Sequence, residues 1–359
     1  MISRLLSWIG IAVIAGLTGA ICALTLVPPT VVLPPTVPER QPVVISKTSI
    51  VRPPRLPVIA VSIVSQRSLR PIDGGASVAD ADTIGVATVL TSDGWMVTDR
   101  AVFESVSDPA VLLPGGIVRP VLTSVTDAEM HLTFFQVAAK ELDAIAFGES
   151  ASLAPGDTLF RTQPDHQIAS IVLVQAHNRP RVEARDVIRP SNAVAERLVL
   201  ANPVGREEVG GGLVTEKGAL VGILVALQKN QATTRIAVPI EPVARALRDV
   251  VKTGAIHRSS IGVSTLDLSE LAKRDTEMVG AFGARVVAVD PQSSAASAGI
   301  LVSDRIITLG GDALDGSRLL SDLVASYRIG ETVTVTYVRN GQTMTVPLLV
   351  QEQTAAKKK

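Results

Sequence analysis

The order of apolar and polar positions divides the chain into an apolar run, a proline-rich stretch and two regions of short strands. Residues 5–27 contain no charged side chain, and residues 28–57 repeat proline at short intervals. From residue 58 to residue 227, short runs of β-branched residues alternate with turn residues, which predicts many short strands. A second pattern of the same kind follows residue 257. The sequence therefore predicts two β-rich domains behind an apolar N-terminal segment.

The first strand-rich region begins with a hairpin pattern. Residues 83–90 and 95–98 are mostly apolar or β-branched, and Ser92, Asp93 and Gly94 lie between them as a turn. Further strands are predicted at residues 110–113, 117–123, 132–138, 168–174, 198–201 and 219–227. This number and spacing of short strands is typical of a barrel or a sandwich.

A predicted helix separates the two strand-rich regions. Residues 241–252 carry apolar side chains at helical spacing, and Gly254 marks the end of this helix. After it, strands are predicted at residues 261–264, 284–289, 305–309, 332–339 and 343–350, and helical segments at residues 295–298 and 317–327. Asn340 and Gly341 have the residue types of a tight hairpin turn between the last two strands.

The apolar run is long enough to cross a membrane. A bilayer core needs roughly 20 apolar residues as helix, whereas the apolar part of a signal peptide has about 7–15. We therefore predict a transmembrane anchor at residues 1–27, with a cleaved signal peptide as the alternative. Arg4 is the only charge before the run, which favours a cytoplasmic N-terminus, a single pass through the cytoplasmic membrane and extracytoplasmic domains in the periplasm or at the cell exterior.

The segments on either side of the predicted domains have simple compositions. Residues 28–57 contain repeated prolines, which favour an extended polyproline conformation and a semi-rigid linker. Residues 353–359 are polar, which is typical of a disordered tail.

Charge and cysteine content exclude several classes of function. The chain has 34 Lys and Arg residues against 34 Asp and Glu residues, so no basic field predicts nucleic-acid binding. Cys22 is the single cysteine, which excludes an intramolecular disulfide. The four histidines are scattered without the spacing of metal ligands, so we predict no metal site and no cofactor.

Several segments together resemble one protein family. They are residues 85–98 (GVATVLTSDGWMVT), 147–150 (FGES), 155–157 (PGD) and 236–240 (IAVPI). Their residues and order resemble the HtrA/Deg group of trypsin-like serine proteases, in which a PDZ domain follows the protease domain. The resemblance covers about residues 83–350. It implies a mainly β fold, with a trypsin-like double β-barrel over residues 58–256 and a C-terminal PDZ domain over residues 257–352.

The second half of the chain resembles the PDZ domain of this family closely. Residues 258–263 (RSSIGV) are similar to the loop that binds a peptide carboxylate. Residues 293–300 (SSAASAGI) and 304–307 (DRII) resemble the segments that follow in the family. Ser303 stands where the family usually has glycine, a departure that affects a turn rather than the fold.

The same resemblance assigns the positions of the catalytic triad. The general base falls on Ala101, the orienting carboxylate on His131 and the nucleophile on Val209. Alanine and valine carry no ionisable or nucleophilic group, and loss of either the base or the nucleophile lowers such a rate by several orders of magnitude. The resemblance therefore predicts a protease-like domain without catalytic residues.

Two alternatives stay open at these positions. His131 is either a relocated base or ligand, or a surface or turn histidine in the former aspartate position. Residues 210–212 (GGG) either form a nest of N–H groups that holds an anion, or allow a tight turn between strands.

Peptide binding by the PDZ domain is the function that the resemblance leaves intact. In this mode an extended peptide adds a strand to a sheet edge, and backbone N–H groups hold its terminal carboxylate. The candidate residues are Ser260, Ile261 and Gly262 for the carboxylate, Val263 at the start of the edge strand, and Leu319, Leu320 and Leu323 for the pocket wall. The alternative for Ile261, Val263 and the leucines is ordinary core packing.

The sequence thus predicts a membrane-anchored, catalytically inactive scaffold or adaptor. Its predicted partners are C-terminal or extended peptides of other proteins. A homo-oligomer such as a trimer, or assembly with an active homologue, is implied by the resemblance alone. The alternatives are a serine-type endopeptidase of the HtrA/Deg class acting in protein quality control, and a regulatory subunit of an active homologue.

Overall fold

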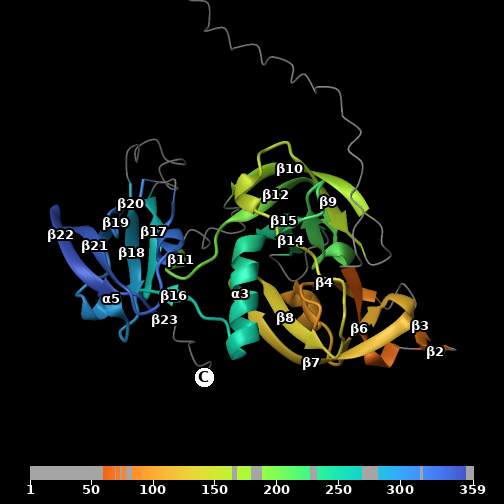
Figure 1. Cartoon of the computed structure of the whole chain (residues 1–359). Coiled ribbons are helices and arrows are strands. Elements are labelled where there is room, and N and C mark those ends of the chain that lie inside the picture. The colour runs from red at the N-terminus through yellow and green to blue at the C-terminus, as the bar shows by residue number, and fades with distance from the viewer. Residues whose placement is uncertain are drawn as a thin grey trace, which may run out of the picture. The chain divides into compact units, whose positions relative to one another are not determined.

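The structure is a computed structural model of the chain (Figure 1). It describes residues 60–68, 70–72, 75–77, 83–163, 168–178, 188–226, 233–268, 282–315 and 318–352. The predicted anchor, the proline-rich linker and the C-terminal tail lie outside these residues. Among the residues that the structure describes, no helix combines the length and the hydrophobicity that a bilayer crossing needs.

The first strand-rich region forms a closed barrel. Its strands follow the order β1 (Ala60–Ser65), β4 (Thr83–Val89), β5 (Trp95–Asp99), β8 (Leu132–Val137), β7 (Ile117–Asp127) and β6 (Pro109–Leu113). A short hairpin of β2 (Arg70–Ile72) and β3 (Gly75–Ser77) accompanies the barrel. Met96 and Phe135 are fully buried in its core, because alternate residues of each strand point inward. The hairpin predicted at residues 83–98 is present as β4 and β5.

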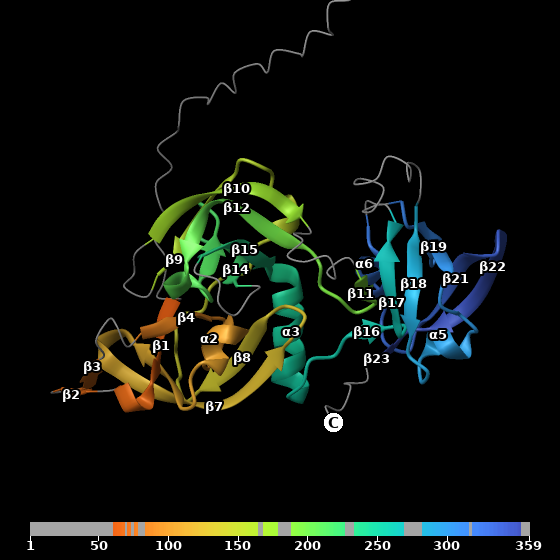
Figure 2. The same ribbon diagram turned by 180° about the vertical axis from the view of Figure 1, so that it is seen from behind.

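A second closed barrel follows along the chain. Its strands follow the order β10 (Ile168–Asn178), β12 (Arg197–Gly205), β15 (Thr233–Pro239), β14 (Leu220–Val225), β13 (Gly212–Val214) and β9 (Thr158–Thr162). The helix predicted at residues 241–252 is present as α3 (Ile240–Thr253), and it ends at Gly254 with φ 75°. Val243, Leu247 and Val250 of α3 pack into one core cluster with residues of both barrels, and Figures 1 and 2 show α3 alongside β8 and β15.

The C-terminal region forms a seven-stranded sheet. The main order is β11 (Ile188–Pro190), β17 (Val263–Asp267), β18 (Ala284–Val289), β19 (Arg305–Leu309), β21 (Thr332–Arg339) and β22 (Gln342–Leu349), and β20 (Asp312–Ala313) pairs with β19. β16 (Ser259–Ser260) pairs separately with β23 (Gln351–Glu352). Two short helices, α5 (Ser294–Ser297) and α6 (Leu320–Val324), complete the domain. The fold is therefore mainly β, with a double barrel and a C-terminal PDZ-type domain, as the sequence predicted.

Local residue choices explain the turns that connect these strands. Asn340 and Gly341 have φ values of 51° and 78°, the left-handed conformation that a tight two-residue hairpin turn requires. The helix predicted at residues 317–327 is shorter in the structure. It begins after Leu319, whose backbone N–H donates to the Asp322 carboxylate at 2.8 Å, and it ends at Val324.

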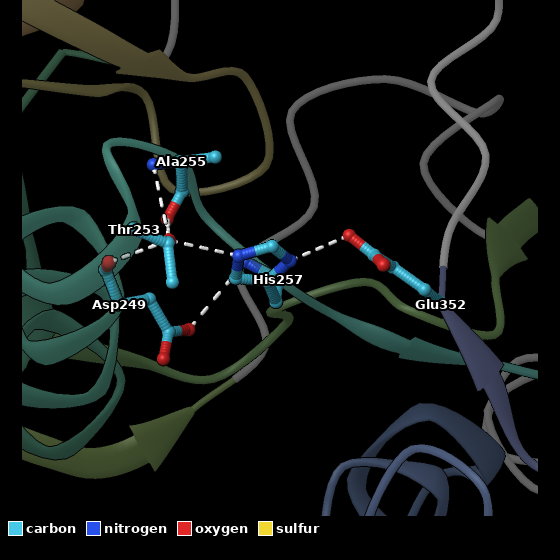
Figure 3. Close-up of polar contacts among 5 residues, drawn as sticks. All are labelled: Asp249, Thr253, Ala255, His257 and Glu352. Carbon is cyan, nitrogen blue, oxygen red and sulfur yellow. Dashed lines mark hydrogen bonds and ion pairs between the residues drawn. The ribbon is translucent and has the colours of Figure 1, made fainter.

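His257 fixes the chain between α3 and β16 (Figure 3). One ring nitrogen, Nδ1, lies 2.6 Å from Oε1 of Glu352 on β23, and Nε2 lies 2.9 Å from Oγ1 of Thr253 at the end of α3. Its backbone N–H also donates to the Asp249 carboxylate at 3.4 Å. These contacts tie the segment before the PDZ-type domain to both neighbouring elements.

Ser303 provides a test of the local backbone. Its φ of 78° lies in the left-handed region that favours glycine. A non-glycine residue in this conformation destabilises the folded state by on the order of 1 kcal/mol. Glycine removes this strain, but it also increases the conformational entropy of the unfolded chain, which offsets part of the gain. We expect Ser303→Gly to raise the free energy of unfolding by about 0.5 kcal/mol and to shift the calorimetric melting temperature of the C-terminal domain upward. Ser297→Gly, at a helical position of α5, is the control and is expected to lower the melting temperature. An unchanged or lower melting temperature for Ser303→Gly contradicts the left-handed conformation of Ser303.

Candidate functional site

The position assigned to the general base lies in the first turn after β5. Ala101 belongs to α2 (Arg100–Glu104), and the Asp99 side chain caps this short helix. Oδ1 of Asp99 accepts the N–H groups of Ala101 at 2.7 Å and Val102 at 3.2 Å, and Oδ2 accepts the N–H of Ala226 at 2.9 Å. Burial raises the pKa of the Asp99 carboxyl, and the three backbone bonds oppose this rise. Asp99 therefore holds α2 against the second barrel, and Ala101 contributes only a methyl group.

The position assigned to the orienting carboxylate lies next to this helix. His131 has φ 58° and occupies the turn between β7 and β8. Its backbone carbonyl accepts the N–H of Arg100 at 2.8 Å, and Arg100 directly precedes Ala101 in the chain. The structure thus brings the first two assigned positions together and places His131 in a turn.

The position assigned to the nucleophile is part of the hydrophobic core. Val209 is 1% exposed and belongs to the same cluster as Val102, Phe135 and Ala226. Two buried threonine hydroxyls lie nearby, and each donates to a backbone carbonyl: Thr98 to Val86 at 2.7 Å and Thr88 to Gly210 at 2.9 Å. The Thr88 bond joins the two barrels, and the Thr98 bond lies within the first barrel, between β5 and β4.

The glycine run after Val209 has its N–H groups bonded within the protein. Gly210 donates to the Leu224 carbonyl at 2.9 Å and Gly211 to the Glu208 carbonyl at 3.0 Å. Gly212 donates to Oγ1 of Thr162 at 3.0 Å. An anion-binding nest needs N–H groups that converge on a ligand, so this geometry corresponds to the tight-turn alternative.

A buried ion pair lies directly before Val209. Oε1 of Glu208 is 2.6 Å from Nη1 of Arg161 on β9, and Glu208 is 7% exposed. Burial raises the pKa of the Glu208 carboxyl, and the Arg161 guanidinium opposes this rise. No pattern in the sequence connects the two positions, so this pair could not be predicted from it. It attaches the short turn η6 (Arg206–Glu208) to the second barrel.

The second candidate site is the loop between β16 and β17. Ser260 ends β16, Val263 begins β17, and Ile261 and Gly262 connect them. Gly262 has φ 75°, and a Cβ added there would lie 2.0 Å from Cβ of Ser293. Its carbonyl accepts the N–H of Asp290 at 2.8 Å, and the Ile261 carbonyl accepts the N–H of Ala295 at 3.1 Å. The loop is therefore held in a fixed conformation against the start of α5.

The three candidate leucines lie on α6 and just before it, and all are buried. Leu319 and Leu320 line a small pocket together with Thr265 and Ala284. Leu320 and Leu323 also belong to the core cluster of the C-terminal domain. The three leucines therefore differ: Leu319 lines the pocket beside β17, Leu320 lines the pocket and also packs in the core, and Leu323 packs in the core.

One strand of this site was not predicted from the sequence. β11 pairs with β17 as an additional antiparallel strand, and its Arg189 and Pro190 line the same pocket. Three residues with a proline carry little strand signal, because proline cannot donate to a sheet. The run also lies far from β17 in the chain, and only the tertiary fold brings the two together.

Comparisons with known proteins agree with this architecture. Residues 259–350 match the family model described as PDZ domain. The chain is similar to the serine endoprotease DegS of Haemophilus influenzae, with 23% identity over 77% of this chain and 81% of that protein. It is also similar to the periplasmic serine endoprotease DegP of Escherichia coli K12, with 26% identity over 78% of this chain and 59% of that protein.

A solved structure has the same fold. The HtrA-type protease AlgW with a decapeptide superimposes with a TM-score of 0.65 and 18% sequence identity, covering 84% of this chain and 98% of that chain. The likeness extends over the double barrel and the C-terminal domain together. This agreement supports the fold that the residues predicted.

Proposed function

We propose that this chain, a homologue of the HtrA/Deg serine endoproteases with a trypsin-like double barrel and a PDZ domain, binds peptides without cleaving them. The PDZ domain captures C-terminal or extended segments of other proteins. The double barrel serves as a docking or oligomerisation surface, either in a homo-oligomer such as a trimer or with an active homologue. The predicted anchor holds the chain at the outer face of the cytoplasmic membrane, in keeping with the periplasmic DegP relative.

One observation carries the non-catalytic part of the proposal. At the assigned nucleophile position, a valine side chain is packed among Val102, Phe135 and Ala226. Attack on a peptide carbonyl requires an oxygen or sulfur nucleophile and a base within hydrogen-bond reach of it. Hydrocarbon at both Val209 and Ala101 supplies neither. The assignment of these positions rests on the resemblance of the flanking segments.

A fluorophosphonate probe tests this part directly. The probe labels serine nucleophiles that a neighbouring base activates, so the purified chain is expected to remain unlabelled. A serine-active HtrA relative labelled in parallel is the positive control. Stoichiometric labelling of this chain, with the modified residue identified by mass spectrometry, contradicts the proposal.

Peptide binding rests on the loop and the pocket of the C-terminal domain. Gly262 has a positive φ and a contact that leaves no room for a side chain, so the loop geometry depends on glycine. We expect Gly262→Glu to abolish binding to a C-terminal peptide array, because it adds both bulk and a negative charge beside a carboxylate site. Gly341→Glu, in the hairpin turn at the opposite edge of the sheet, is the control and retains binding; unchanged binding by Gly262→Glu contradicts the loop assignment.

A serine-type endopeptidase is the second candidate function, because the similar proteins DegS and DegP are endoproteases by name. It requires a rebuilt catalytic site and predicts labelling by the probe above. A third candidate is a regulatory subunit of an active homologue. Co-purification of such a homologue from the native membrane distinguishes that role from a solitary scaffold.

A further inference from the structure

The edge of the PDZ sheet where a peptide would add is covered by a segment of the same chain. β11 pairs antiparallel with β17, with Ile188 opposite Leu266, Arg189 opposite Thr265 and Pro190 opposite Ser264 (Figure 1). β17 has β18 on its other side, so β11 takes the one edge that remains on that strand. A strand can be paired on two sides only, and an added peptide needs the side that β11 holds.

The residue after β11, Ser191, makes polar contacts with the loop between β16 and β17, the candidate carboxylate-binding loop. The backbone N–H of Ser191 donates to the Val263 carbonyl at 2.8 Å. Its hydroxyl oxygen accepts the N–H of Ile261 at 3.2 Å and lies 3.1 Å from the hydroxyl of Ser260. Ser191 is 1% exposed, so the loop is closed to solvent at this point.

These contacts reproduce the arrangement of a bound peptide. In strand addition the ligand runs antiparallel to the edge strand, and its last residue reaches the N–H groups of the loop. The segment runs from Ile188, opposite the later part of β17, to Ser191 at the loop. Its side chains also reach the pocket wall, since Arg189 and Pro190 line the pocket with Leu319 and Leu320.

We propose that residues 188–191 are an internal ligand of the PDZ groove, which an external peptide must displace. The inference rests on the proposed peptide-binding function and adds its regulation. The Ser191 hydroxyl is a neutral acceptor in the position where an external peptide presents a carboxylate. Hydrogen bonds to a charged acceptor are roughly twice as strong as those to a neutral one, so the displacing partner is an extended peptide with a free C-terminus.

Occupation by the internal ligand lowers the apparent affinity for any external peptide. The apparent dissociation constant equals the intrinsic constant divided by the fraction of molecules with an open groove. Weakening the segment therefore tightens external binding, and locking the segment in place prevents it. Both changes can be made without altering the loop residues or the leucines of the pocket.

A disulfide tests whether the segment lies in the groove. Arg189 and Thr265 are direct cross-strand partners, and such pairs have Cα distances of about 4.5–5.5 Å, within the range that a disulfide spans. The variant Arg189→Cys/Thr265→Cys is made in the full chain with Cys22→Ser, which removes the only natural cysteine. Arg189→Cys/Thr343→Cys is the control, because Thr343 lies on β22 at the opposite edge of the sheet. We expect the first pair to oxidise completely under conditions where the control stays reduced; equal oxidation of both overturns the proposal.

Peptide binding to the same variants tests displacement. The probe is a fluorescein-labelled decapeptide pool, random at nine positions and ending in valine with a free carboxylate, and binding is measured by fluorescence anisotropy. We expect no binding to the oxidised Arg189→Cys/Thr265→Cys protein and recovery after reduction. Ser191→Ala loses one acceptor of the internal ligand and binds about 3- to 10-fold more tightly than the wild type. A pool with an amidated C-terminus is the control for carboxylate recognition.

The outcomes separate this inference from the function on which it rests. Equal binding by the oxidised and reduced proteins, with the disulfide formed, overturns the internal ligand but leaves peptide binding intact. Formation of the disulfide without binding by the reduced protein or by Ser191→Ala keeps the internal ligand and contradicts the proposed peptide-binding function.

Discussion

Replacing Gly210 by alanine is expected to destabilise the double barrel by more than about 3 kcal/mol. Gly210 has φ 95°, and a Cβ added there would lie 2.1 Å from the Val86 carbonyl oxygen and 2.5 Å from Oγ1 of Thr98. Both atoms belong to rigid strands of the first barrel, so the backbone itself must move. Unfolding in urea, followed by the fluorescence of Trp95, which is buried in the first barrel, measures the change.

Gly156→Ala separates the steric contact from backbone strain. Gly156 has φ 97°, close to that of Gly210, and no atom of the residues that the structure describes lies within 4 Å of the added Cβ. Gly156→Ala is therefore expected to destabilise the fold by only about 1 kcal/mol, from the left-handed backbone conformation alone. Equal destabilisation by the two variants would contradict the close contact of Gly210 with Val86 and Thr98 of the first barrel.

Arg258→Met is expected to destabilise the fold by about 3 kcal/mol, because it removes the ion-pair partner of a buried carboxylate. Asp127 is 4% exposed and forms an ion pair with the Arg258 guanidinium. Its other oxygen accepts the N–H groups of Glu129 at 3.0 Å and Met130 at 3.1 Å, so the turn before β8 depends on the same side chain. Calorimetry of the purified chain measures the loss.

Two further variants identify the cause of that loss. Arg318→Met removes a partner of Asp312 from a pair in which both side chains are about half exposed, and exposed pairs contribute about 0–1 kcal/mol. Asp127→Asn in the Arg258→Met background removes the unpaired charge and recovers part of the stability. If Arg258→Met is no more harmful than Arg318→Met, the pair at Asp127 is solvated rather than buried.

Local sequence patterns predict much of the fold, and the elements that they miss or place wrongly have physical reasons. β4 and β5 were predicted because a strong apolar pattern surrounds a turn with Gly94. β7 was predicted to end near residue 123 but continues to Asp127, because its last residues are mostly exposed and polar, and pairing with β8 rather than burial extends it. β13, with only three residues, carries too short a pattern to be recognised.

At the candidate sites, too, the sequence predicts features that depend on local conformation but not those that depend on tertiary contacts. Gly262 was singled out from the sequence, and its positive φ gives a local reason for glycine at that position. The pairing of β11 with β17 has no local signal, because it depends on how a connection of the second barrel meets the edge of another sheet. The burial of Val209 likewise reflects packing between strands that are distant in sequence.

Hydrolysis of casein by the purified chain tests most directly whether the double barrel lacks protease activity. Intact protein mass spectrometry follows the substrate, with an active HtrA-type protease and a mock purification assayed in parallel. We expect product formation no faster than in the mock purification, since the assigned positions Ala101 and Val209 offer neither base nor nucleophile. Cleavage at a rate comparable to that of the active protease, retained through further purification, contradicts the account.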